Sequence, residues 1–127
     1  MLAELLYREL SGSIIDAAIE VHRELGPGLL ESAYEACLWH LLTQRDLTCH
    51  RQVELPIHFR GMSVDAGYRI DLLVDQKIIV ELKAIEHLHP IHDAQLVTYL
   101  RLSGYRVGLL INFNVMRLRD GVKRLIL

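Results

Sequence analysis

The sequence predicts an α/β fold in which a mixed β-sheet is flanked by helices. The first observation is a pair of strand-like runs within residues 67–84, rich in β-branched residues and joined by a tight turn. The second is residues 106–112, which are apolar on both faces, as expected of a central strand. The third is the helical periodicity of residues 90–103 between them, which predicts a right-handed β-α-β crossover with parallel strands.

Two helices are predicted before the first strand. Ser11 or Ser13 can cap a helix that continues to Leu25, with apolar residues at helical spacing. The run Gly26-Pro27-Gly28 ends that helix, because glycine favours a helix C-terminus and proline the residues just beyond it. A second helix is expected over residues 29–45.

Three strands are then expected in succession, and the last two form the hairpin. The first covers residues 49–59, where apolar side chains alternate. Pro56 within it indicates an edge position or a bulge, because proline lacks the N–H that a sheet requires. Arg60-Gly61 predicts a turn into a strand over residues 63–74, which leads directly to the hairpin turn.

The last third of the chain is expected to contain a helix, a strand and a second hairpin. The helix covers residues 90–103 and the strand residues 106–112. Residues 115–119 and 122–127 are then predicted to form a closing hairpin around Asp120-Gly121.

Composition limits the classes of protein that fit. With 127 residues, of which 51% are hydrophobic, the chain is expected to be a single domain over residues 1–127. The absence of a long apolar run or a signal-peptide pattern predicts a cytoplasmic protein without membrane contact. Cys37 and Cys49 lack zinc-type spacing and are expected to be reduced. A net charge of −2 means that any nucleic-acid binding must come from a local basic patch.

Three charged residues interrupt the apolar hairpin. If its turn is centred on Gln76, Asp71 lies directly opposite Glu81, and Lys83 lies on the same face as Glu81. Two carboxylates at that separation can share a hard divalent cation, with the lysine placed to contact a phosphate or an attacking water.

A plainer interpretation is a cross-strand ion pair on a solvated face, since such pairs are common and stabilise little. The neighbouring residues 78–80 and Leu82 are apolar on both faces, which indicates a buried strand. Ionised groups are rare in such a strand unless they are paired or bind a metal, so the pattern favours a site.

Two further polar residues lie on predicted helices. Glu31, in a first helical turn, is either favoured there by the helix dipole or is a third acidic group of the site. Gln95 shares an apolar row with Ile91 and Tyr99, so it is either a hydrogen-bonded core amide or a site residue.

Three histidines, His87, His89 and His92, lie close together before and within the third predicted helix. Their spacing fits no standard zinc site, although one of them could contact substrate.

The ordered motifs resemble a known group of enzymes. An Asp followed about ten residues later by Glu-x-Lys on a hairpin resembles the PD-(D/E)XK nuclease superfamily. Residues 28–34, Gly-Leu-Leu-Glu-Ser-Ala-Tyr, resemble the name-giving motif of the GxxExxY family within it. Gln95-x-x-x-Tyr99 resembles an element that lines the active site in RecB-like nucleases. The likeness covers residues 13–127 and implies a restriction-endonuclease-like αβββαβ core.

The resemblance implies a nuclease that uses Mg²⁺ or Mn²⁺ to hydrolyse phosphodiester bonds in DNA or RNA. An alternative is a nuclease-like scaffold or binding module without catalytic activity. The oligomeric state is left open, and a homo-oligomer is among the options. The implied metal ligands and catalytic residues are the side chains of Asp71, Glu81 and Glu31, the backbone carbonyl of Leu82, and the side chains of Lys83, Gln95 and Tyr99.

Overall fold

A computed structural model describes residues 2–127, without the side chains of residues 3 and 4. The helices are α1 (Leu2–Leu5), α2 (Arg8–Leu25), α3 (Glu31–Gln44), α4 (Pro90–Ser103) and the 3-10 helix η1 (Leu118–Gly121). The strands are β1 (Cys49–Glu54), β2 (Ile57–Phe59), β3 (Met62–Val64), β4 (Arg69–Val74), β5 (Ile78–Lys83), β6 (Val107–Asn112) and β7 (Val122–Ile126).

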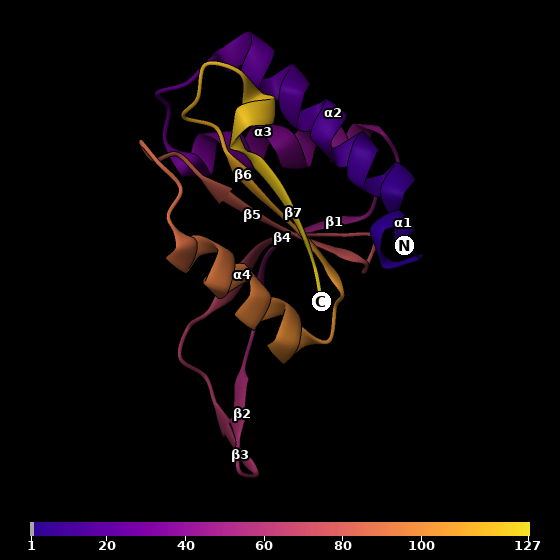
Figure 1. Cartoon of the computed structure of the whole chain (residues 1–127), viewed down its shortest axis with the longest axis vertical. Helices are drawn as coiled ribbons and strands as arrows, with labels where there is room; N and C mark the ends of the chain where they lie inside the picture. Colours follow the sequence, from indigo (N-terminus) through magenta and orange to yellow (C-terminus); the bar gives the residue numbers. More distant parts are fainter. Residues whose placement is uncertain (1) are drawn as a thin grey trace.

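Five of the strands form one mixed sheet in the order β1-β4-β5-β6-β7 (Figure 1). β5 and β6 are parallel and are connected through α4, whereas the other neighbouring strands are antiparallel. The predicted α/β fold with a mixed sheet flanked by helices is therefore confirmed, including the β-α-β crossover.

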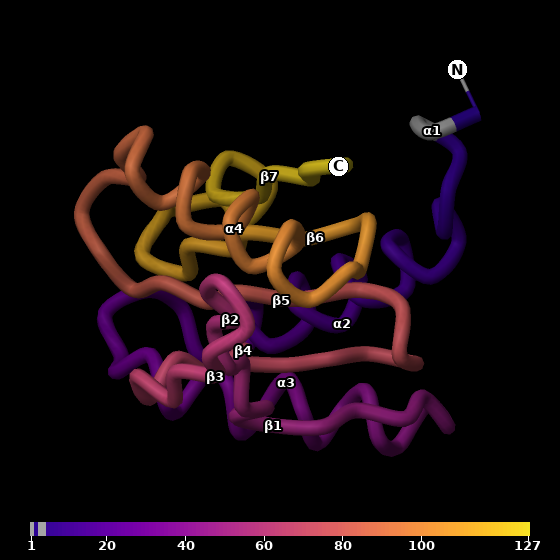
Figure 2. Tube along the Cα trace, turned by 90° about the horizontal axis from the view of Figure 1, so that it is seen from below, coloured from indigo at the N-terminus to yellow at the C-terminus, as the bar shows by residue number. Residues whose placement is uncertain are grey.

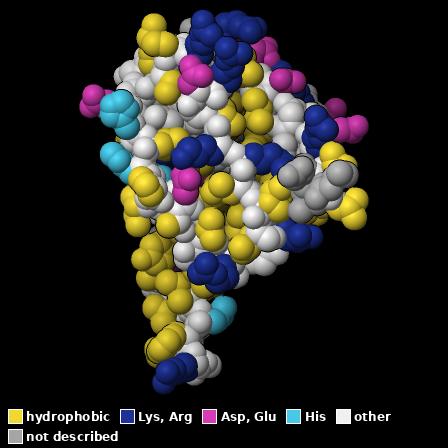
Figure 3. All heavy atoms as spheres, viewed as in Figure 1, with side chains coloured by type: hydrophobic (Ala, Val, Ile, Leu, Met, Phe, Trp, Pro, Cys, Tyr) yellow, Lys and Arg dark blue, Asp and Glu magenta, His cyan; other side chains and the backbone are white. Residues whose placement is uncertain are grey.

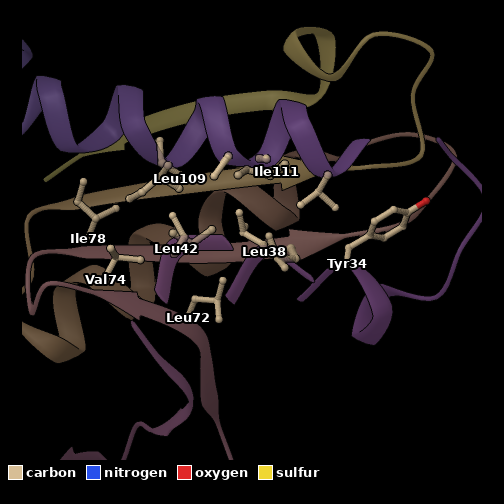
Figure 4. Close-up of a cluster of buried hydrophobic side chains, with 14 of the residues drawn as sticks. Tyr34, Leu38, Leu42, Leu72, Val74, Ile78, Leu109 and Ile111 are labelled. Carbon is tan, nitrogen blue, oxygen red and sulfur yellow. The ribbon is translucent and has the colours of Figure 1, made fainter. Parts of the chain in front are cut away.

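Helices cover both faces of the sheet. α2 and α3 lie on one face and α4 on the other (Figure 1). Figure 4 shows the core beneath α2 and α3, where Leu38 and Leu42 of α3 meet strand residues such as Leu72 and Ile111. No helix in residues 2–127 is long and apolar enough to cross a membrane.

α4 approaches the sheet closely at β6. A Cβ added to Gly108 would lie 2.8 Å from a methyl carbon of Leu96, which is closer than two carbon atoms can pack. Glycine at this position therefore leaves room for the Leu96 side chain of α4 to pack directly on β6.

The two long strands predicted over residues 49–59 and 63–74 are each divided in two. Their inner parts pair only with each other, as the β2–β3 arm, which extends from the sheet on the side of α4 (Figure 1) and is seen end-on in Figure 2. Pro56 and Gly67, with a φ of 79°, lie where the chain leaves the sheet, and both disfavour a continuous strand. Pro56 was expected at an edge position or a bulge: β1 does lie at the edge of the sheet, and at Pro56 the chain leaves the sheet instead of forming a bulge.

The closing hairpin predicted over residues 115–127 is wrong. Its first half contains the 3-10 helix η1, and only β7 joins the sheet, beside β6. Leu118 is buried against the core in this helix, which an extended strand at the sheet edge would not achieve. Helix limits differ less: α2 begins at Arg8, before either serine that was expected to cap it.

Candidate active site

The β4–β5 hairpin changes its hydrogen bonding at the two acidic residues. The regular ladder pairs Leu72 with Val80, so the next opposed pair is Asp71 and Glu81. The Asp71 N–H donates to Glu81 Oε1 at 3.1 Å, and the Leu82 N–H donates to Asp71 Oδ2 at 2.9 Å. Each carboxylate thus accepts one backbone N–H at the end of the ladder, which directs the two side chains toward each other.

This arrangement strongly affects Glu81, whose residue surface is only 5% exposed. Burial, followed by the negative charge of Asp71, raises the pKa of Glu81 to about 9. The nearby Lys83 acts in the opposite direction and does not offset these effects. In the absence of a cation, the carboxylate pair therefore retains a proton at neutral pH.

Lys83 lies two residues beyond Glu81, on the same face of β5, and is half-buried. It lines an open pocket of about 550 Å³ together with Gln95 and Tyr99 of α4. The Gln95 side-chain amide donates to the Tyr99 hydroxyl at 3.2 Å. Burial, then the charge of Glu81, raises the pKa of Tyr99, so this pocket adjoins the carboxylate pair.

Glu31 is the first residue of α3 and lies at the surface. With Asp71, Glu35 and Gln52 it lines a second hollow of about 370 Å³. Partial burial, then the charge of Asp71, raises the pKa of Glu31, whereas Lys83 lowers it. Its position at the helix N-terminus and its proximity to Asp71 are thus both observed.

The turn that precedes Glu31 is fixed by Tyr34. Its hydroxyl donates to the Gly26 carbonyl at 2.6 Å and accepts the Leu29 N–H at 3.0 Å. Its ring stacks on Phe113 with centroids 4.4 Å apart, and Figure 4 shows the hydroxyl pointing away from the core. In the run from Gly28 to Tyr34, the tyrosine therefore holds the turn and the glutamate faces the acidic hollow.

Three residues near Asp71 were not identified from the sequence. Glu35 is buried and accepts hydrogen bonds from Arg51 at 3.1 Å and from the Gln52 amide at 2.5 Å. The Gln52 amide also lies 3.4 Å from Asp71 Oδ1. Gln52 has a φ of 51° and is absent from the ladder between β1 and β4, so β1 is irregular beside the acidic pair.

Asn112 supports the site from β6. Its side chain accepts the Ile85 N–H at 3.1 Å and donates to the Ile85 carbonyl at 2.9 Å. It is paired with Lys83 in the parallel ladder and is buried. Asn112 could have been identified from the sequence, because it is a polar residue at the end of an apolar strand. Its hydrogen bonds to Ile85 hold the chain that follows Lys83.

The acidic groups do not form a complete ligand cluster. Among residues 2–127, as far as the side chains are described, no three His, Cys, Asp or Glu residues are grouped to hold a metal ion. The convergent pair of Asp71 and Glu81 fits a hard cation such as Mg²⁺, which binds few carboxylates and retains several waters. Two of the histidines stabilise a helix end instead, because His92 Nδ1 accepts the His89 N–H at the start of α4.

One comparison with known proteins identifies the superfamily of the chain. No curated protein and no solved structure shows a significant match to the chain. A sequence model described as the PD-(D/E)XK nuclease superfamily matches residues 8–125, which include both acids of the hairpin, Lys83 and all of α4. The chain therefore belongs to the PD-(D/E)XK nuclease superfamily.

Proposed function

We propose that the protein is a nuclease that hydrolyses phosphodiester bonds with the aid of Mg²⁺ or Mn²⁺. The observation that supports it most strongly is the convergence of the partly buried Asp71 on the buried Glu81, with Lys83 on the same face as Glu81. Two ionised carboxylates this close together in a largely apolar sheet destabilise it unless a cation compensates their charge. Nucleases of this superfamily generally use divalent metals.

The acidic residues would hold the ion. Asp71 and Glu81 would supply carboxylate oxygens, and the Leu82 carbonyl and Glu31 would complete the set directly or through water. When bound, the ion supplies positive charge that activates a water and offsets the charge gathering on the phosphate. The two hard carboxylates suit Mg²⁺ or Mn²⁺ better than a thiol-preferring metal.

The neighbouring residues would act on the substrate. Lys83 would orient the attacking water or neutralise charge on the phosphate, because it is the cation that lines the pocket beside Glu81. Gln95 and Tyr99, already hydrogen-bonded to each other, would position the phosphate or the water.

Nucleic acid as substrate is supported by a local basic surface despite the net charge of −2. Three arginines, Arg23, Arg117 and Arg119, line a hollow of about 430 Å³ near the end of α2. Such a group can bind phosphates, with an affinity that falls as salt rises. We also propose that the chain belongs to the GxxExxY group, because Gly28, Glu31 and Tyr34 stand at that spacing.

The test is metal-dependent cleavage by purified protein. With Mn²⁺ or Mg²⁺, the wild type is expected to cleave DNA or RNA, and EDTA should abolish cleavage. Lys83→Ala should lower the rate roughly 10²- to 10³-fold, as loss of a charge-stabilising group does. It should leave Mn²⁺ affinity intact, because the lysine is not a ligand. Asp71→Ala should lose both Mn²⁺ binding and cleavage.

Lys77→Ala is the matched control, since Lys77 lies on the same hairpin at the opposite end and is exposed. It should cleave like the wild type. Cleavage that survives Lys83→Ala would show a contaminating nuclease. If the protein binds Mn²⁺ but cleaves no single-stranded or double-stranded DNA or RNA, the nuclease proposal is wrong and the protein is a nuclease-like scaffold.

A further inference from the structure

The pocket beside Lys83 opens onto an exposed apolar surface. Figure 3 shows hydrophobic side chains along the β2–β3 arm and over the adjacent part of α4. Tyr68, at the base of the arm, is 44% exposed and meets Tyr99 edge to face, with ring centroids 6.2 Å apart. Ile91 of α4 is 68% exposed and lines the same pocket. Large apolar surfaces of this kind usually mark a binding site.

The chemistry of the lining restricts the occupant. Among its described lining residues the pocket has one lysine, one histidine, one amide and no acidic side chain; the rest are apolar, aromatic, Ala or Thr. Its volume of about 550 Å³ lies within the range of ligand-binding pockets, roughly 300–1,000 Å³. A duplex backbone would require a row of cations, which this lining lacks.

An unpaired nucleotide satisfies these features. Its base can stack on an aromatic ring, its edge can hydrogen-bond to an amide, and its phosphate can meet a cation. Tyr68, Gln95 and Lys83 offer these three contacts in one pocket. Farther along the arm, Phe59 is 57% exposed, and the Arg60 guanidinium lies 5.3 Å from the centre of its ring. This pair adds a second aromatic ring and a second cation beside the pocket.

We propose that this pocket binds an unpaired base next to the scissile phosphate, so that the substrate is single-stranded nucleic acid. The proposal deepens the nuclease function and rests on it for the position of the phosphate. Stacking between bases is already satisfied within a duplex, whereas a single strand exposes the base faces that Tyr68 and Phe59 can cover.

The test is binding in EDTA, where no cleavage interferes. Fluorescein-labelled single strands of about 12 nucleotides, oligo(dT) or oligo(U), are compared by anisotropy with a DNA duplex of the same length. Tyr68→Ala should weaken single-strand binding roughly 5- to 150-fold, the equivalent of one lost base stack, and leave duplex binding unchanged. Tyr68→Phe, which keeps the ring, should bind like the wild type.

Tyr105→Ala is the matched control. Tyr105 packs on the same face of the sheet, but at the other end of β5, where its hydroxyl donates to Gln76. It should not change single-strand affinity. Thermal melting of each variant shows whether it is folded. A strand of the same length in which every nucleotide is abasic keeps the phosphates but offers no base: it should bind the wild type more weakly than oligo(dT), and Tyr68→Ala should cause no further loss.

Several results would overturn the proposal: equal loss of single-strand and duplex affinity in Tyr68→Ala, no loss at all, or a dimer that Tyr68→Ala dissociates while strand affinity is unchanged. The last result would assign the surface to a second copy of the chain. Failure here is distinct from failure of the nuclease function. If the wild type cleaves duplex but shows no Tyr68-dependent binding of single strands, the nuclease proposal stands and the single-strand proposal fails. If single-strand binding depends on Tyr68 but no cleavage is found, only the nuclease proposal fails.

Discussion

α2 and α3 together cover one face of the five-stranded sheet, whereas α4 alone covers the other (Figure 1). Under the two helices lies a continuous core that includes the fully buried Leu38, Leu42 and Tyr34 (Figure 4). Under α4 the core is smaller, and the face opens into the pocket that holds Lys83 and Gln95. Most of the hydrophobic packing is thus on one face of the sheet, and the accessible polar residues of the pocket are on the other.

The difference between the two faces explains how a small sheet can tolerate the buried Glu81. The face under α2 and α3 supplies most of the apolar burial, which is the main favourable contribution to folding. The face under α4 can therefore carry the polar side chains of Glu81 and Lys83 without being filled by apolar groups. The predictions below test whether stability and function are divided in this way.

The largest effect is expected for a truncation in the covered core. Leu38→Ala removes a fully buried side chain and should destabilise the protein by about 2–5 kcal/mol. Leu102→Ala, in the wall of the open pocket where the residue is partly exposed, should change stability by about 0.5 kcal/mol or less. Urea denaturation measures both. Equal losses would show that α4 seals its face as fully as α2 and α3 do.

The next effect concerns pH and the buried acid. Glu81 has a pKa of about 9 in the folded protein, whereas the pKa of a glutamate in the unfolded chain is near the ordinary value of 4.5. Between these values the folded state binds one more proton than the unfolded state. Its contribution to stability is therefore complete below pH 4.5 and is lost as pH rises toward 9, by at most about 1.4 kcal/mol per pH unit.

Glu81→Gln isolates this contribution. The amide cannot ionise, so between pH 6 and 8, in EDTA, the variant should gain stability relative to the wild type as pH rises. Urea denaturation at several pH values measures the difference, in which the contributions of other titrating groups largely cancel. A constant difference between the two proteins across this window would mean that Glu81 ionises normally in the folded state.

A smaller effect is expected at Tyr34, which connects the covered face with the site. Tyr34→Phe keeps the ring stacked on Phe113 but removes the hydroxyl that holds Gly26 and Leu29. Loss of these hydrogen bonds should destabilise the protein by about 1 kcal/mol. Because the same turn places Glu31, cleavage by the folded protein should also fall. Tyr105→Phe, which loses one exposed hydrogen bond to Gln76, is the control and should change neither.

The opposition of the two hairpin acids could be predicted because it depends on local geometry. Strand parity and a turn centred on Gln76 are sufficient to oppose Asp71 and Glu81, whatever surrounds them. The helix α4 was also predicted with its observed bounds, since Pro90 and Gly104 mark its two ends.

The remaining features depend on distant contacts. Residues 57–64 alternate in the same way whether they pair within the main sheet or with each other, so only Pro56 and Gly67, at the base of the arm, indicated the β2–β3 arm. Gln52 and Glu35 meet only because β1 passes α3 at that level. Leu118 lies in a 3-10 helix, where it packs against the hydrophobic core, and no pattern in the neighbouring sequence predicts this contact.

The smallest effect is expected for the ion pair that connects α4 with β7. Lys123 Nζ lies 3.2 Å from both carboxylate oxygens of Asp93, and both side chains are partly exposed. Such pairs contribute about 0.2–1 kcal/mol, and salt screens them. A double-mutant cycle with Lys123→Ala and Asp93→Ala, measured by urea denaturation at low and high salt, gives the coupling energy directly. A coupling energy above about 2 kcal/mol would contradict the division of stability and function between the two faces, because this ion pair would then contribute substantially to holding α4 on the sheet. A small, salt-sensitive value is expected if the packing of Leu96 against Gly108 holds the helix instead.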